Sequence, residues 1–124
     1  MIDALAGLVE AGDVVVLSGA GLSTESGIPD YRGPRGAALR RHAPMTYQAF
    51  TTDVDARRRY WARSHLGWGR IRAAQPNAGH RVVAAWESEG WILGTITQNV
   101  DGLHTAAGSQ RVVDLHGRLD RVVC

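Results

Sequence analysis

The run VVVL at residues 14–17 constrains the fold most, because it leads directly into a glycine-rich loop. Four consecutive apolar residues, three of them β-branched, are typical of a buried strand in a parallel sheet. Two later segments have the same character: residues 91–100 predict a second buried strand, and residues 111–117 predict a third strand followed by a bend at Gly117. The chain therefore carries three candidate strands.

Helical patterns separate these strands. Apolar residues at helical spacing predict an amphipathic helix at the N-terminus, with Gly12 as its left-handed stop. Asn77 is the expected N-cap of a further helix that ends at Gly90, and residues 102–108 predict a short helix or turn. Strands that alternate with helices favour an α/β fold, in which right-handed crossovers join the strands of a parallel sheet.

The segment 46–71 carries five aromatic side chains and predicts helices with a break near Gly67 and Gly69. We interpret its aromatic residues as core rather than as a cofactor site. All 14 basic residues of the chain are arginines, and the net charge is only +2. We interpret the arginine clusters at 40–41 and 57–59 as solvated helix faces, so the composition gives little support to nucleic-acid binding.

Length and composition limit the class of protein further. The 124 residues fit one compact domain or part of a larger one. No apolar run approaches the roughly 20 residues that span a bilayer, and the N-terminus carries acidic residues where a signal peptide carries positive charge. We therefore expect a cytoplasmic protein with no membrane partner. Cys124 is the only cysteine, so no internal disulfide can form.

The loop GAGLSTESGIPDYRG, residues 19–33, follows the first candidate strand. Gly19, Ala20 and Gly21 let backbone N–H groups approach an anion, and a helix starting just beyond would direct its positive end at a phosphate. A pyrophosphate suits such a loop; the alternative is a tight turn without a ligand. The standard dinucleotide fingerprint requires a third glycine where this chain has Thr24, which argues against an ordinary dehydrogenase.

Two polar segments are expected at one edge of the sheet. TQNVDGLH ends the second strand, so Gln98, Asn99 and Asp101 would lie at the carboxyl edge, where α/β folds bind ligands. His116 ends the third strand at the same edge, where an imidazole could act as a general base on a hydroxyl. A polar turn and a core histidine are the alternatives for these positions. The other histidines are interpreted as packing (His104) or as surface or capping groups (His42, His65 and His80).

Together these motifs resemble the sirtuins, a family of NAD-dependent protein-lysine deacylases. The family pattern is GAGxSxxSGIPD[FY]RG, PNxxH, TQNxDxLH and LHG, followed by the first cysteine of a CxxC. Here the matching segments are residues 19–33, 76–80, 97–104 and 115–117, followed by Cys124, and the match extends over about residues 11–124. Tyr31, with RRRYWARSHLGWGRI and LHGRLDRVVC, is most similar to the class II branch, which includes mitochondrial deacylases.

The resemblance implies an enzyme that transfers the acyl group of a modified lysine to ADP-ribose and releases nicotinamide. His116 would be the base that activates a ribose hydroxyl, and Asn99 would assist it in the nicotinamide-ribose pocket. The implied partner is an acyl-lysine protein or peptide. The implied NAD-binding residues are Gly19, Ala20, Gly21, Ser23 and Thr24 around the phosphates and ribose, Asp30, Tyr31 and Arg32 in a cofactor loop, Ile28 and Asp101 on the carboxamide, and Gln98, Asn99 and His116.

The resemblance covers only the N-terminal portion of a sirtuin. It implies that residues 1–124 are a partial catalytic domain, a Rossmann-like NAD-binding half that ends at the first zinc cysteine, with the zinc-binding small domain mostly missing. A structural zinc needs four ligands, so Cys124 would hold zinc only if other cysteines are supplied. Missing later strands would leave an unpaired edge and an exposed apolar face.

Three alternatives to deacylation remain open at this stage. The chain could be a non-catalytic fragment that binds NAD or ADP-ribose. It could instead catalyse class II-type ADP-ribosyl transfer or remove lipoyl-type acyl groups, because the same residues would serve all of these reactions. The acyl preference does not follow from the sequence.

Overall fold

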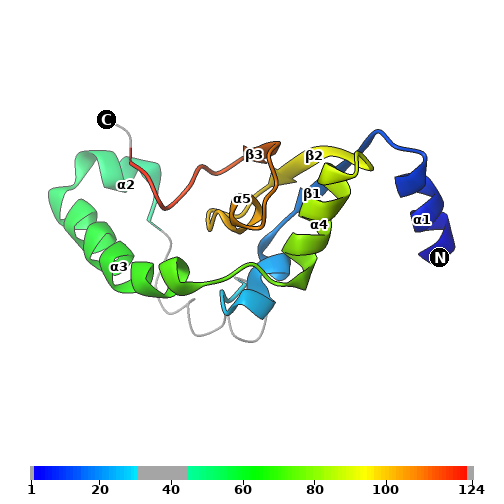
Figure 1. The fold of residues 1–124 in the computed structure, drawn as a ribbon. Helices are drawn as coiled ribbons and strands as arrows, with labels where there is room; N and C mark the ends of the chain where they lie inside the picture. The colour runs from blue at the N-terminus through cyan, green and yellow to red at the C-terminus, as the bar shows by residue number, and fades with distance from the viewer. Residues whose placement is uncertain (1, 31–44, 123–124) are drawn as a thin grey trace.

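The computed structural model describes residues 2–30 and 45–122. A three-stranded parallel sheet forms its centre, with strands β1 (Val14–Ser18), β2 (Ile92–Thr97) and β3 (Val112–Asp114) in the order β1-β2-β3 (Figure 1). All three predicted strands are present, although β2 and β3 are shorter than expected. The α/β fold class, with a parallel sheet and flanking helices, is confirmed.

Helices cover one face of this sheet and flank its ends. The N-terminal helix α1 (Ile2–Glu10) is present, and Gly12 follows it with a φ of 81°, as predicted. The helix α4 (Ala78–Ser88) packs against β2 and against the short helix α5 (Leu103–Ala106). A 3₁₀ helix, η1 (Ala20–Ser26), follows β1.

The helices α2 (Tyr47–Thr52) and α3 (Val54–Ala73) lie at the far end of the molecule from α1 (Figure 1). The predicted break near Gly67 and Gly69 is wrong, because α3 continues through both glycines. A glycine in a helix interior costs about 1 kcal/mol relative to alanine. The rest of the 20-residue helix α3 offsets this cost. The chain breaks instead at Asp53, whose carboxylate accepts hydrogen bonds from the N–H groups of the first turn of α3.

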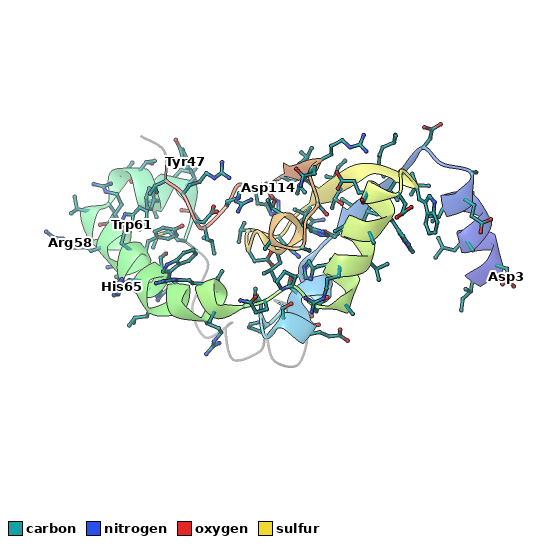
Figure 2. All side chains as sticks on the ribbon, viewed as in Figure 1. Asp3, Tyr47, Arg58, Trp61, His65 and Asp114 are labelled. Carbon is teal, nitrogen blue, oxygen red and sulfur yellow. The ribbon has the colours of Figure 1, made fainter. Side chains whose placement is uncertain are left out.

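Aromatic residues of α2 and α3 contact one another, but their interpretation as core is wrong for Tyr47 and Trp61, which are 76% and 48% exposed. Phe50 of α2 contacts Tyr60 and Trp61 of α3 edge-on, at ring centroid distances of 5.1 and 6.3 Å. Figure 2 shows Arg58 pointing away from these helices, and its side chain is 77% exposed, as expected for a solvated face. Within the described residues, no helix is both long and apolar enough to cross a membrane.

The two faces of the sheet differ in polarity. On the face that α4 and α5 cover, Ser18 pairs with Thr97 and Thr97 pairs with Asp114. The opposite face carries Val15, Leu17 and Val113, which are 48%, 68% and 56% exposed. The predicted exposed apolar face is therefore present among the described residues.

A buried carboxylate joins the end of α4 to the start of β3. The side chain of Glu87 is 5% exposed, and its oxygens accept hydrogen bonds from the backbone N–H groups of Gln110 (3.1 Å) and Arg111 (2.7 Å). The guanidinium of Arg111 lies 3.6 Å away. Glu87 thus fixes the strand that leads to His116.

We expect the substitution Glu87→Ala to lower the free energy of unfolding by about 2–3 kcal/mol, because two backbone N–H groups lose their charged acceptor. Urea unfolding followed by circular dichroism measures this change. Glu89→Ala is the matched control, since Glu89 is exposed and its side chain makes no hydrogen bond within the described residues. Equal effects of the two substitutions would contradict the assigned role of Glu87.

Candidate functional site

A pocket of about 660 Å³ lies at the carboxyl edge of the sheet. Three separate segments of the predicted site contribute to its wall: the loop after β1, the segment after β2 and the turn after β3. Among the predicted residues, those that line it are Ala20, Ser23, Ile28, Gln98, Asn99, Asp101 and His116. The face of α3 from Leu66 to Ile71 closes the opposite wall, a contribution that sequence reasoning missed.

A hydrogen-bond network ties the glycine-rich loop to the end of β2. The side-chain amide of Asn99 donates to the carbonyl oxygen of Gly19 (3.0 Å) and to Oγ of Ser23 (3.0 Å). Ser23 in turn donates to Oδ2 of Asp101 (2.7 Å), and Oδ1 of Asp101 accepts from the N–H of Leu103 (2.9 Å). Because a carbonyl oxygen only accepts, the amide nitrogen of Asn99 must face Gly19.

The loop itself leaves room for a ligand. A side chain added at Gly19 or Gly21 would meet no atom within 4 Å, so packing within the described residues does not require glycine there. The first helical hydrogen bond of η1 runs from the N–H of Leu22 to the carbonyl of Gly19 (3.0 Å), which leaves the preceding N–H groups outside the helical pattern. The expected helix dipole is small, because η1 is only seven residues long. The backbone N–H groups therefore carry the anion-binding argument.

His116 lies in the turn after β3, two residues beyond the strand that was predicted to end with it. Its Nδ1 atom lies 3.1 Å from the carbonyl oxygen of Gln98. Since this oxygen can only accept, Nδ1 carries the hydrogen, and the neutral ring keeps a free lone pair on Nε2. His116 also lines the pocket that contains Asn99 and Asp101. Its geometry suits a base that receives a proton at Nε2.

Arg118 anchors the turn that carries His116. Its guanidinium donates to both carboxylate oxygens of Asp120 (2.9 and 2.7 Å) and to Oγ1 of Thr105 in α5 (3.2 Å). The carboxylate of Asp120 raises the pKa of Arg118 above its usual value, so the cation is permanent. A side chain at Gly102, where φ is 73°, would lie 2.6 Å from this guanidinium. These contacts explain why glycine stands at position 102 and arginine at position 118, two residues to which the sequence motifs assign no role.

The predicted histidine roles are met in part. His65 is exposed on α3, as expected, and His104 is buried, as a packing residue should be. For His80 the capping interpretation is confirmed, because His80 completes the capping box of α4 with Asn77, and the surface alternative is wrong, because His80 is 0% exposed. His42 lies outside the described residues.

The remaining predicted site residues do not line the pocket or cannot be placed. Gly19 joins the network through its carbonyl, whereas Gly21, Thr24 and Asp30 are not part of the pocket wall. Tyr31, Arg32 and Cys124 lie outside the described residues. Within residues 2–30 and 45–122, no group of three or more His, Cys, Asp or Glu side chains gathers as a metal site.

Comparison with known proteins agrees with this arrangement. A sequence model of the Sir2 family matches residues 19–124, and the chain therefore belongs to the Sir2 family. It is similar to NAD-dependent protein deacetylase 1 of Streptomyces coelicolor, with 68% identity over 120 residues, which is 97% of this chain and 40% of that protein. NAD-dependent protein deacetylase 3 of Pseudomonas syringae is 54% identical over 125 residues, covering 100% of this chain and 44% of that protein.

Solved structures show the same fold. A structure described as Sir2 with a p53 peptide and NAD⁺ is 34% identical, with a TM-score of 0.79, over 95% of this chain and 46% of that one. A second structure, described as the structural basis of sirtuin substrate affinity, is 37% identical, with a TM-score of 0.77, over 96% of this chain and 48% of that one. The chain thus spans less than half the length of the relatives it matches.

Proposed function

We propose that this chain forms the NAD-binding half of an NAD-dependent protein-lysine deacylase, and that an acyl-lysine protein or peptide is its substrate. One observation carries the proposal: Asn99, Ser23 and Asp101 connect the glycine-rich loop to the pocket that His116 also lines. The names of the relatives support the activity, and the structure described with a p53 peptide supports a peptide substrate.

The described residues fit NAD as a cofactor. The pocket lies within the range of roughly 300–1,000 Å³ that small-molecule sites occupy. The open space at Gly19 and Gly21 would let backbone N–H groups contact the pyrophosphate, and the carboxylate of Asp101 would accept a hydrogen bond from the nicotinamide amide. When bound, NAD supplies nicotinamide as a leaving group and a ribose hydroxyl that accepts the acyl group.

The chain's own residues would then do three things. The N–H groups of the loop would hold the phosphates, the Asn99 network would keep the loop at the end of β2, and Nε2 of His116 would take the proton from the ribose hydroxyl. The wall that α3 contributes would help to exclude water. Zinc would be held only together with cysteines from another segment, since Cys124 alone offers one ligand.

A non-catalytic module that binds NAD or ADP-ribose is the second candidate. It is supported by the glycine-rich loop and the Asn99 network, which would hold a nucleotide whether or not turnover follows. Both candidates require nucleotide binding. The two candidates differ in whether the bound NAD is consumed in a reaction. Catalysis would also need residues that the 124-residue chain does not contain.

Calorimetric titration of the 124-residue chain with NAD tests both candidates. We expect binding in the micromolar to millimolar range, because the loop and the Asn99 network are present but the remaining contacts are not. Gln48→Ala on the exposed face of α2 is the control variant and should bind NAD equally well. A chain with a folded circular dichroism spectrum and no heat of binding would contradict the proposal.

A further inference from the structure

The segment that carries His116 has no apolar anchor. It comprises residues 115–122, and its three apolar side chains, Leu115, Leu119 and Val122, are 53%, 41% and 75% exposed. Burial of apolar side chains is the main force that holds a segment against the rest of a fold. Hydrogen bonds and ion pairs therefore have to fix this segment.

Backbone hydrogen bonds join the segment to the end of β2 and to the residues after it. The N–H of Leu115 donates to the carbonyl of Thr97 (2.9 Å), and the N–H of Leu119 donates to the carbonyl of Val100 (3.0 Å). His116 lies between these two points and is exposed. The two bonds fix the path of the backbone, but they do not fix the direction of the imidazole.

The ring of His116 has one hydrogen-bond partner within the described residues. Its Nδ1 atom meets the carbonyl oxygen of Gln98, and this contact is exposed to solvent. A hydrogen bond that is open to water contributes little net free energy, because water competes for both groups. The orientation of the ring therefore depends on how firmly the turn is held beside Gln98.

Arg118 supplies the contacts that the apolar residues do not. It is the only residue of this segment that is not largely exposed, with 16% of its side chain accessible. Its guanidinium donates to both carboxylate oxygens of Asp120 and to Oγ1 of Thr105 in α5, and it lies 3.9 Å from Oδ2 of Asp114 at the end of β3. A planar guanidinium holds several partners at once, because its N–H groups point in fixed directions. Arg118 thus joins the segment to α5 and to β3.

We propose that Arg118 is a positioning residue for His116. By tying the turn to α5 and β3, it keeps Nδ1 of His116 against the carbonyl of Gln98 and leaves Nε2 free to receive a proton. The consequence for turnover rests on the proposed function. The orientation of the ring does not, since it is measured without NAD.

Arg121 provides a matched contrast to Arg118. It carries the same charge, and its Nε atom lies 3.6 Å from Oδ1 of Asp120, but its side chain is 64% exposed. Within the described residues, this contact is its only ion pair, and no ion pair joins it to α5 or β3. Substitutions at the two arginines therefore separate the charge beside Asp120 from the attachment of the turn.

The ion pair of Arg118 with Asp120 persists over the pH range in which the ring is measured. The hydrogen bond from Arg118 is the main cause that lowers the pKa of Asp120, and Arg121 adds to it. A carboxylate with a lowered folded pKa contributes stability that is present above its unfolded pKa of about 3.9 and is lost as the pH falls through the folded value. A change in the His116 ring near pH 8 therefore does not come from titration of Asp120.

Long-range ¹H–¹⁵N spectra of the histidine rings test the positioning role in the 124-residue chain. At about pH 8, where an exposed imidazole is neutral, His116 should carry its hydrogen on Nδ1. In Arg118→Ala the ring should leave Gln98 and populate both tautomers, whereas exposed His65 should not change. A parental tautomer of His116 in Arg118→Ala would overturn the proposal, and so would a hydrogen on Nε2 in the parent chain.

Two further variants make the spectra specific. Arg121→Ala removes the same charge beside Asp120 and should leave the His116 ring as it is in the parent chain. Arg118→Lys keeps the charge, but a single ammonium cannot reproduce the fork on Asp120 together with the contact to Thr105, so both tautomers should again appear. Equal changes in Arg121→Ala and Arg118→Ala would contradict the proposal. If circular dichroism shows that Arg118→Ala does not fold, the lysine variant decides, since a parental ring there would refute the positioning role.

Turnover shows whether the orientation of the ring matters for the reaction. In a chimaera with the remaining part of the Streptomyces coelicolor deacetylase, we expect Arg118→Ala to lower kcat for nicotinamide release by about 10- to 100-fold, because a misplaced catalytic group loses its alignment. The KM for NAD should change by less than about threefold, and Arg121→Ala should leave kcat unchanged. A displaced ring with the parental kcat would overturn the positioning role. A parent chimaera without turnover would count against the proposed function, while the ring spectra would still decide whether Arg118 orients His116.

Discussion

Replacing His116 with alanine is expected to reduce nicotinamide release by about 10²- to 10⁴-fold, the usual contribution of a general base. The enzyme for this experiment is a chimaera in which residues 1–124 replace the matching 40% of the Streptomyces coelicolor deacetylase. The physical reason is the orientation of the ring: Nδ1 faces the carbonyl of Gln98, and only Nε2 can receive the proton. Release of nicotinamide from NAD in the presence of an acetyl-lysine peptide is the measurement.

Two comparisons make this result specific. The dissociation constant for NAD should change by less than about threefold in His116→Ala, since the loop and the Asn99 network hold the phosphates without the imidazole. His65→Ala, on the exposed face of α3, should leave turnover unchanged. Turnover by His116→Ala within a few-fold of the parent chimaera would refute the role of His116 as the base.

Local patterns in the sequence were sufficient for the sheet and for the position of the site. The apolar run 14–17 and the segments around Ile96 and Val113 predict strands because β-branched residues favour extended backbone. Once the strands are parallel, their carboxyl ends must lie at one edge, and this brings Asn99 and Asp101 to the loop after β1. The site thus follows from topology, without knowledge of any side-chain contact.

Contacts between distant residues were beyond the same reasoning. Ser18 contacts Thr97 and His104 across 79 and 86 positions of the chain, and no local pattern marks these pairs. The break at Asp53 was also missed, because a glycine pair suggests a helix end more strongly than an aspartate does. In the structure, the hydrogen bonds of Asp53 to the next helix determine where the chain turns.

The difference between the two faces of the sheet could not be predicted from the sequence either, because it depends on which face the helices cover. The covered face carries the hydroxyl groups of Ser18, Thr95 and Thr97 beside valine side chains, whereas Leu17 and Val113 on the opposite face are exposed. A parallel sheet is ordinarily apolar and covered on both faces, so the exposed apolar face and the buried hydroxyl groups both depart from that pattern. The polar residues on the covered face also hold Asn99 in place: Ser18 contacts Thr97, and Oγ1 of Thr97 accepts the backbone N–H of Asn99. Buried side chains of this sheet therefore position the candidate site.

Replacing Asn99 with alanine is expected to weaken NAD binding by about 10- to 100-fold. The substitution removes the donor to the carbonyl of Gly19 and the donor to Ser23, and both groups are partly or fully buried. A buried polar group that loses its partner costs about 1–3 kcal/mol, and 1.4 kcal/mol corresponds to tenfold in affinity. Calorimetric titration of the 124-residue chain with NAD measures the loss, with Gln48→Ala as the exposed control.

A second substitution at the same position separates shape from hydrogen bonding. Asn99→Asp has nearly the same shape, but its carboxylate cannot donate to Gly19 and lies close to the carboxylate of Asp101, which already accepts from Ser23. We expect Asn99→Asp to bind NAD at least as weakly as Asn99→Ala. Affinity near that of the parent chain in the aspartate variant would show that the amide donor does not hold the loop, and the network would lose its place in the site.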